Sequence, residues 1–166
     1  SDRDRVQLDA EGSIQYGMYY WDDNYPDSHV FAEGECLRKT FDPDFMLYHT
    51  MAVDEWGHMK GADSAEYANA VAAVGHLIAA RMPEWLEKGY QVVVTADHGM
   101  NNLGIHVGTE YAQREVALYI FSDKVENGRF EENYISQLNV APLVCKLMGV
   151  PATEGMKQEL EIVFSK

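Results

Sequence analysis

Cysteine is scarce in this sequence of 166 residues, and its pattern indicates no particular chemistry. Cys36 and Cys145 are the two that occur, and they are far apart and form no CxxC pair. We therefore interpret both as buried thiols. So few cysteines also argue against a small protein held together by disulfides, and the length is that of one domain.

Positive charge is scarce as well. Lys and Arg together number 13 against 27 Asp and Glu, which gives a formal net charge of −14. A surface this acidic repels phosphate backbones and anionic lipids. We therefore expect no nucleic-acid coating and no membrane-surface role.

The sequence lacks a long apolar run. Its best candidate, residues 71–80, is interrupted by Gly75 and His76 and falls short of the roughly 20 residues that a membrane span needs. The first five residues are charged and no apolar segment follows them, so we predict neither a signal peptide nor a transmembrane segment. The cellular compartment stays open.

The remaining pattern predicts an α/β fold. Residues 1–44 form an irregular N-terminal segment with one short helix around 28–39, which we take as part of the same unit as the α/β metal-binding portion, 45–166. In that portion we expect strands at 45–53, 91–96 and 115–121 and helices at about 63–81 and 136–148. The first strand reads as buried on both faces. Alternating strands and helices are typical of layered α/β domains.

Potential metal ligands follow two of the predicted strands. Asp54 and His58 come after the first, Asp97 and His98 come directly after the second, and His106 lies in the next loop. Asp-xxx-His is common by chance, and Asp-His-Gly is also compatible with a simple turn. Three such signals at strand ends, where sites of α/β sheets gather, favour two carboxylates and three imidazoles around a zinc-like dication.

Several motifs occur in a fixed order between Phe45 and Pro151. They are Asp54-Glu55-Trp56-Gly57-His58-Met59-Lys60-Gly61, Thr95-Ala96-Asp97-His98-Gly99-Met100, Gly104-Ile105-His106-Val107-Gly108-Thr109, Val140-Ala141-Pro142 and Leu147-Met148-Gly149-Val150-Pro151. In this order and spacing the chain resembles the later part of the alkaline phosphatase superfamily. The branch it resembles most is that of type I phosphodiesterases and nucleotide pyrophosphatases.

This resemblance implies a partial alkaline-phosphatase-like layered fold, a mostly parallel sheet flanked by helices. It also implies two zinc ions about 4 Å apart that clamp a phosphoryl group of a small phosphoester or nucleotide substrate. One site is complete on paper, with Asp54, His58 and His106 as ligands. Asp97 and His98 supply half of the second. We therefore expect glycines 57, 99 and 108 to allow sharp turns beside the ligands.

The Thr or Ser nucleophile of the resembled family has no counterpart in this chain, because the hydroxyls before Asp54 lack its helix-start context. We therefore expect a fragment of a metal-dependent phosphoric-ester hydrolase that is inactive alone. The alternatives are a phosphate-transferring mutase of the same superfamily and a catalytically silent metal-binding or interaction module. An exposed sheet edge would also favour a dimer or aggregation.

Overall fold

The computed structural model describes residues 6–128, 134–156, 160 and 162–165. The chain divides into two compact units, which we call the first unit (Ser1–Pro83 and Ala96–Val116) and the second unit (Glu84–Thr95 and Ala117–Lys166). The division expected between residues 44 and 45 stays a prediction. No helix among the described residues is long and apolar enough to cross a membrane.

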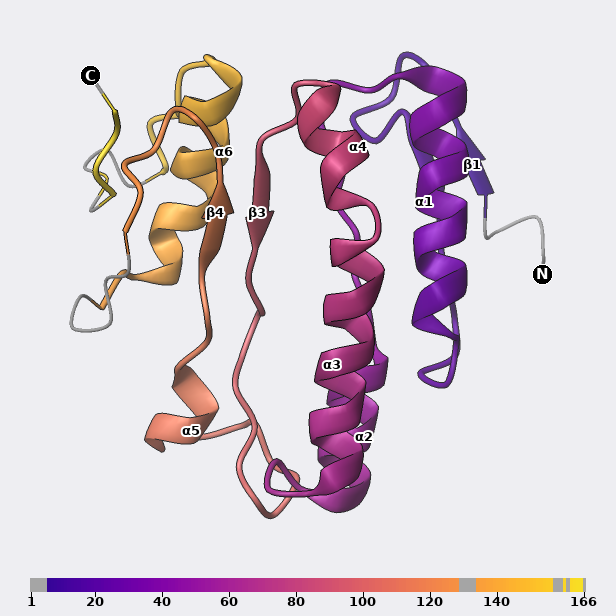
Figure 1. The fold of residues 1–166 in the computed structure, drawn as a ribbon, viewed down its shortest axis with the longest axis vertical. Helices are drawn as coiled ribbons and strands as arrows, with labels where there is room; N and C mark the ends of the chain where they lie inside the picture. The colour runs from indigo at the N-terminus through magenta and orange to yellow at the C-terminus, as the bar shows by residue number, and fades with distance from the viewer. Residues whose placement is uncertain (1–5, 129–133, 157–159, 161, 166) are drawn as a thin grey trace. The chain divides into compact units, whose positions relative to one another are not determined.

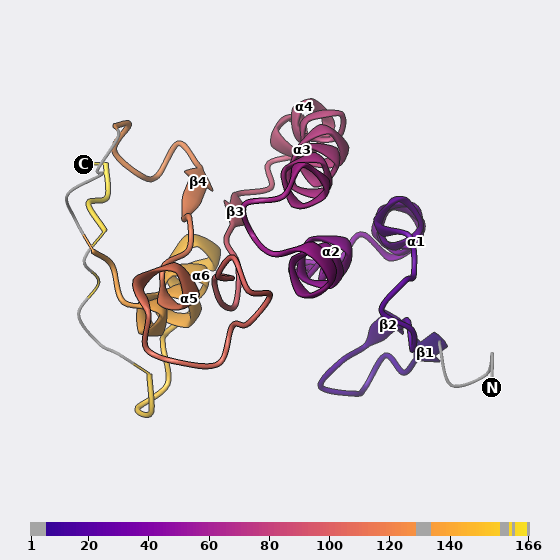
Figure 2. The same ribbon diagram turned by 90° about the horizontal axis from the view of Figure 1, so that it is seen from below.

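The first unit is mainly helical. Strands β1 (Val6–Leu8) and β2 (Tyr16–Met18) form an antiparallel hairpin that the sequence pattern did not reveal. Helix α1 (Asp27–Phe41) extends the short helix expected at 28–39 by a few residues. Helices α2 (Ala52–Lys60) and α3 (Ala65–Ala79) lie side by side in both views, and α5 (Tyr111–Arg114) is a single turn (Figures 1 and 2).

The prediction of a strand at residues 45–53 is wrong. Residues 45–51 form no strand, the described residues contain no strand that pairs with them, and α2 begins at Ala52. A short apolar run without alternation does not distinguish a buried strand from the approach to a helix. The site residues Asp54 and His58 therefore lie on a helix rather than after a strand.

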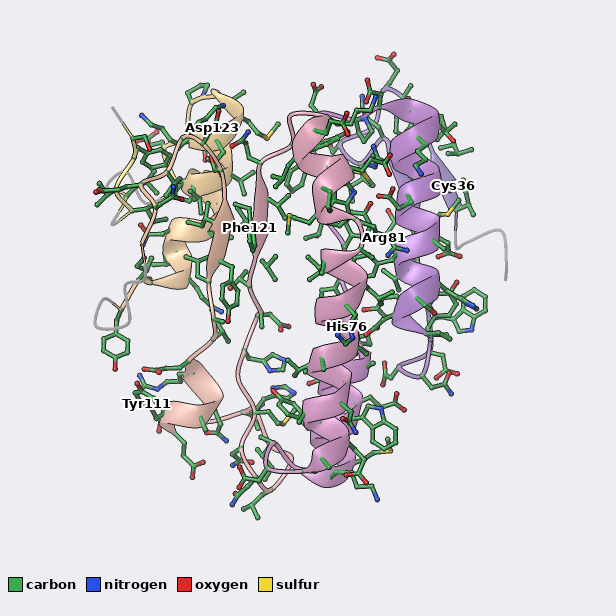
Figure 3. All side chains as sticks on the ribbon, viewed as in Figure 1. Cys36, His76, Arg81, Tyr111, Phe121 and Asp123 are labelled. Atoms are coloured by element: carbon green, nitrogen blue, oxygen red, sulfur yellow. The ribbon has the colours of Figure 1, made fainter. Side chains whose placement is uncertain are left out.

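Side chains from α1 hold the segment that leads to α2. The Tyr48 ring stacks on Phe31 with 5.2 Å between centroids, and the Tyr48 hydroxyl donates to Glu35. Both carboxylate oxygens of Glu35 also accept hydrogen bonds from the buried Arg38 guanidinium, from Nε to Oε1 and from Nη2 to Oε2. Burial raises the pKa of Tyr48, and the Glu35 charge raises it further. The guanidinium of Arg81, labelled in Figure 3, lies 5.2 Å from the centre of the Phe31 ring.

The second unit contains the other sheet. Strand β3 (Val92–Val94) pairs with β4 (Tyr119–Phe121) in antiparallel register, with Val93 opposite Ile120. A 3-10 turn (Gln137–Asn139) leads into helix α6 (Val140–Met148), which ends at Gly149 with φ 73°. Leu143 and Leu147 of α6 and Ile162 form the core and pack against the sheet residues Val93 and Ile120.

The mixture of helices and small sheets agrees with an α/β chain, but a parallel sheet is not shown. Both sheets of the described residues are two-stranded and antiparallel. Runs of β-branched residues predict a strand without fixing the direction of its neighbour. Both cysteines are also less buried than expected, since Cys36 is exposed and Cys145 half-buried.

The ends of the other helices follow local chemistry. Helix α3 begins after Ser64, whose hydroxyl accepts a hydrogen bond from Tyr67 N, close to the start of the helix expected at about 63–81. Helix α4 (Met82–Glu87) carries Pro83 in its first turn, and Gly89 follows with φ 87°. The helix predicted at about 63–81 is thus confirmed to within a few residues by α3, and Pro83 suits the first turn of the separate helix α4.

The start of α2 depends on a side chain from another helix. The side chain of its N-cap residue, Met51, contains no oxygen that could accept a hydrogen bond from the first turn. Instead, Asp27 at the start of α1, only 7% exposed, accepts hydrogen bonds from Met51 N (3.1 Å) and Ala52 N (3.3 Å). A carboxylate here satisfies helical N–H groups and complements the positive end of the helix dipole.

Asp27→Ala is expected to lower the free energy of unfolding by about 1–2 kcal/mol, because the first turn of α2 loses its cap. Urea titration followed by circular dichroism measures this loss. Asp63→Ala is the matched control, since Ser64 rather than Asp63 caps α3. It should stay within about 0.5 kcal/mol of the wild type. Equal losses in both variants would show that Asp27 has no special capping role.

Candidate metal centre

Helix α2 places two of the predicted ligands on one face. Asp54 and His58 are four residues apart, a spacing that puts side chains one above the other on a helix. The His58 Nε2 atom lies 3.5 Å from Asp54 Oδ2. Both residues therefore reach the predicted site from adjacent turns of α2.

The turn after β3 supplies the second pair. His98 Nε2 lies 3.5 Å from Oδ2 of its neighbour Asp97 and 3.7 Å from Asp54 Oδ1. The Asp97 side chain is 68% exposed and that of Asp54 24% exposed, so Asp97 lies at the outer edge. Through its contact with Asp54, His98 thus connects the half-site predicted from Asp97 and His98 with the site predicted from Asp54, His58 and His106.

His106 completes the group from the loop before α5. Its ring stacks on His98, with 3.8 Å between centroids and 15° between planes, and meets His58 edge-on at 5.0 Å. Candidate ligand atoms of Asp54, His98 and His106 all lie within 4.8 Å of one another. The structure therefore brings together all the predicted ligands, which we call the Asp54 cluster: Asp54, His58, Asp97, His98 and His106.

The compact trio differs from the grouping that the resemblance implied. That grouping put His58 with Asp54 and His106, whereas the trio contains His98 in its place. His58 remains beside the trio through its contact with Asp54. The division of the Asp54 cluster between two zinc ions stays a prediction.

Two histidines are oriented as metal ligands usually are. His58 Nδ1 lies 2.8 Å from the Gly104 carbonyl oxygen, and His98 Nδ1 lies 3.0 Å from the Gly99 carbonyl oxygen. A carbonyl oxygen only accepts, so each Nδ1 must donate its proton. The Nε2 atoms, which lie near Asp54, then carry lone pairs when the imidazoles are neutral. Metal-binding histidines commonly donate their other ring N–H to a backbone carbonyl in this way.

Asp54 has an oxygen that lacks a donor. Its Oδ1 atom is buried and accepts no hydrogen bond from the described residues. An unsatisfied buried polar atom costs about 1–3 kcal/mol, and more when it is charged. Carboxylate oxygen and imidazole nitrogen are also the ligands that zinc prefers in sites without cysteine. The residues present therefore fit a bound dication.

The tyrosines around the Asp54 cluster report its negative charge. Burial raises the pKa of Tyr20, and nearby aspartates, Asp97 and Asp54 among them, raise it further. Burial also raises the pKa of Tyr67, with a smaller contribution from Asp54. The Tyr20 hydroxyl also makes a hydrogen bond with His49 Nδ1. A negative potential at this place favours a cation.

Two glycines allow the close approach of backbones around the site. The sharp turn expected at Gly57 is wrong, because Gly57 lies inside α2. A Cβ at this position would nevertheless lie only 2.8 Å from the Met100 side chain. Gly104 has φ 72°, and a Cβ there would lie 2.6 Å from the His58 carbonyl oxygen. This close approach brings the Gly104 carbonyl to His58 Nδ1.

Comparison with known proteins identifies the relationship. Residues 14–143 match the sequence model of the type I phosphodiesterase / nucleotide pyrophosphatase family. The chain belongs to this family. The resemblance drawn from the motifs is thereby confirmed, and with it the alkaline phosphatase superfamily. No solved structure shows a significant match to the chain.

Several curated relatives are similar to this family member. The catalytic subunit of GPI ethanolamine phosphate transferase 3 from Mus musculus is 27% identical over 90% of the chain, and that from Homo sapiens is 29% identical over 68%. GPI ethanolamine phosphate transferase 2 from Debaryomyces hansenii is 25% identical over 65%. The chain spans only 14%, 10% and 14% of the length of these relatives, respectively.

The structure also shows supporting residues that the sequence pattern did not reveal. Buried Asn101 and Gln113 make hydrogen bonds within the loop that carries His106. The available signal was the pair Glu110 and Gln113, which forms a capping box at α5. Its weakness is that Glu rather than Ser or Thr stands at the cap position.

Asp54→Asn is expected to raise the free energy of unfolding of the metal-free chain by about 1 kcal/mol at slightly alkaline pH. The amide removes a buried charge and donates toward the Nε2 lone pairs that face it. Urea titration in the presence of a chelator measures the change. Asp97→Asn, at an exposed carboxylate beside the same histidine, should change it by less than about 0.5 kcal/mol. A clear loss of stability in Asp54→Asn would mean that Oδ1 is already well satisfied without metal.

Proposed function

We propose that this chain is the zinc-binding part of an enzyme that transfers a phosphoester group from one oxygen to another. The convergence of Asp54, His98 and His106, with a buried Asp54 oxygen that accepts no hydrogen bond from the described residues, is the observation that carries the proposal. Membership of a family of phosphoester-acting enzymes supports it.

The residues of the site explain why a cation is needed for such a substrate. Asp54 and Asp97 would repel a phosphoryl group, and the net charge of −14 adds to this repulsion at long range. Bound zinc would neutralise the charge of the two aspartates and act as a Lewis acid toward a phosphoryl oxygen. The Nδ1 hydrogen bonds of His58 and His98 hold both rings so that their Nε2 atoms lie toward Asp54.

The relatives favour transfer to an alcohol over hydrolysis. Those named above are called ethanolamine phosphate transferases, whereas the family name includes phosphodiesterases. Transfer and hydrolysis differ only in whether an alcohol or water accepts the group, so the same metal ligands serve both. Hydrolysis of a phosphodiester or nucleotide is therefore the second candidate function. The proposal also holds that this chain does not supply the Thr or Ser nucleophile and is therefore inactive by itself.

Metal-stripped chain is expected to bind zinc, and His106→Ala should weaken that binding by at least about 100-fold, more than a supporting residue usually costs. Isothermal titration calorimetry measures both affinities. His76→Ala on α3 (Figure 3) is the matched control and should bind as the wild type does. Affinity should be lower in acid, because protons compete with zinc for the imidazole nitrogens. No binding by the wild-type chain would refute a self-sufficient zinc site.

The zinc-loaded chain is expected to bind O-phosphoethanolamine more tightly than AMP if transfer is the correct function. Calorimetric titration with each ligand, with and without zinc, makes the comparison, and inorganic phosphate reports the contribution of the phosphoryl group alone. Preference for AMP would favour the nucleotide-hydrolysing alternative. Binding of none of these ligands would support the silent metal-binding module and count against both catalytic readings.

A further inference from the structure

Gln113 lies at the end of a chain of contacts that leads to His106. It is the third residue of the single turn α5 and is only 5% exposed, although its side chain is polar. A buried amide must find hydrogen-bond partners or destabilise the fold. Its partners therefore indicate what the residue does.

The Gln113 amide nitrogen donates to both residues that flank His106. Its Nε2 atom lies 3.2 Å from the Ile105 carbonyl oxygen and 3.3 Å from the Val107 carbonyl oxygen. An amide NH₂ has two donors, so one side chain satisfies both carbonyls at once. The backbone is thus held immediately before and immediately after His106.

The other groups of Gln113 are engaged as well. Its Oε1 accepts a hydrogen bond from Glu110 N at 3.1 Å, and its backbone carbonyl accepts one from Gly99 N at 2.9 Å, next to His98. Gly108 makes room for the side chain, since a Cβ there would lie 2.4 Å from Gln113 Oε1. One residue is therefore tied to the neighbours of two histidines of the Asp54 cluster.

Asn101 stabilises the other half of the same loop. Its Oδ1 accepts hydrogen bonds from Leu103 N (3.0 Å) and Ile105 N (2.9 Å), and its Nδ2 donates to Glu110. Its backbone carbonyl accepts a hydrogen bond from Ala62 N, which follows α2. Asn101 therefore fixes the course of the loop, whereas Gln113 contacts the residues on either side of His106.

We infer that Gln113 is a positioning residue that holds His106 against His98 and Asp54 before a metal binds. This inference rests on the proposed zinc site and assigns to Gln113 a role in its affinity. With the loop already ordered, binding does not have to supply the free energy of fixing the His106 backbone. Loss of such a supporting contact typically costs 10–100-fold in metal affinity.

The test compares two substitutions with different chemistry. Gln113→Glu keeps the shape but replaces the donor with a carboxylate oxygen that faces two carbonyls. Gln113→Met keeps a similar volume and removes the hydrogen bonds without adding charge. Zinc affinity is measured by calorimetry on samples whose folding is verified by circular dichroism. Both variants are expected to bind zinc at least about tenfold more weakly than the wild type.

Gln15 provides the matched controls. Its exposed side chain donates to the Ala10 carbonyl oxygen at 2.9 Å, so it also ties a loop through an amide, but in the hairpin rather than beside the Asp54 cluster. Gln15→Glu and Gln15→Met should keep wild-type zinc affinity. If Gln113 only stabilised the fold, its substitution would lower the free energy of unfolding and leave the zinc affinity of the folded chain unchanged.

A second measurement on metal-free protein separates this inference from the proposed function. NMR spectra are recorded for each of the two Gln113 variants that circular dichroism shows to be folded. The imidazole resonances of His106 should shift relative to the wild type, while those of His76 should not. Unchanged affinity in both variants overturns the inference and leaves the zinc site intact. If the wild-type chain binds no zinc, the proposed site fails, and unshifted His106 resonances then overturn the positioning role too.

Discussion

The carboxylate of Asp54 is the interaction point on which the candidate site depends. Helix α2 carries it, the turn after β3 brings His98 to one oxygen, and His58 approaches the other. Each imidazole also binds a backbone carbonyl through Nδ1, so both rings are held from two sides. One oxygen of this carboxylate is buried and accepts no hydrogen bond from the described residues, which is unfavourable without a bound cation.

The candidate site could be predicted from the sequence better than the fold around it. Asp54, His58, Asp97, His98 and His106 were identified from motif order, and the structure places them together. A motif identifies the ligand side chains whether a helix, a strand or a loop carries them. The strand expected before Asp54 is absent because an apolar run does not state whether a neighbouring strand is available to pair with it.

The parts that could not be predicted are those that depend on contacts distant in sequence. Nothing near α2 reveals that Asp27 supplies its cap from 24 residues away. Gln113 resembles any surface glutamine until its two carbonyl partners beside His106 are known. The start of α3, which Ser64 caps from within the same segment, could be predicted to within a few residues because its signal is local.

The two units are interleaved along the chain. Residues 84–95, which include β3, belong to the second unit, but segments of the first unit precede and follow them. The backbone therefore passes between the units three times, and neither unit corresponds to one continuous stretch of sequence. No pair of chain ends can isolate the histidine-bearing unit, because His58 and His98 lie on opposite sides of the β3 segment. A gene fragment that encodes the whole of one unit must also encode part of the other.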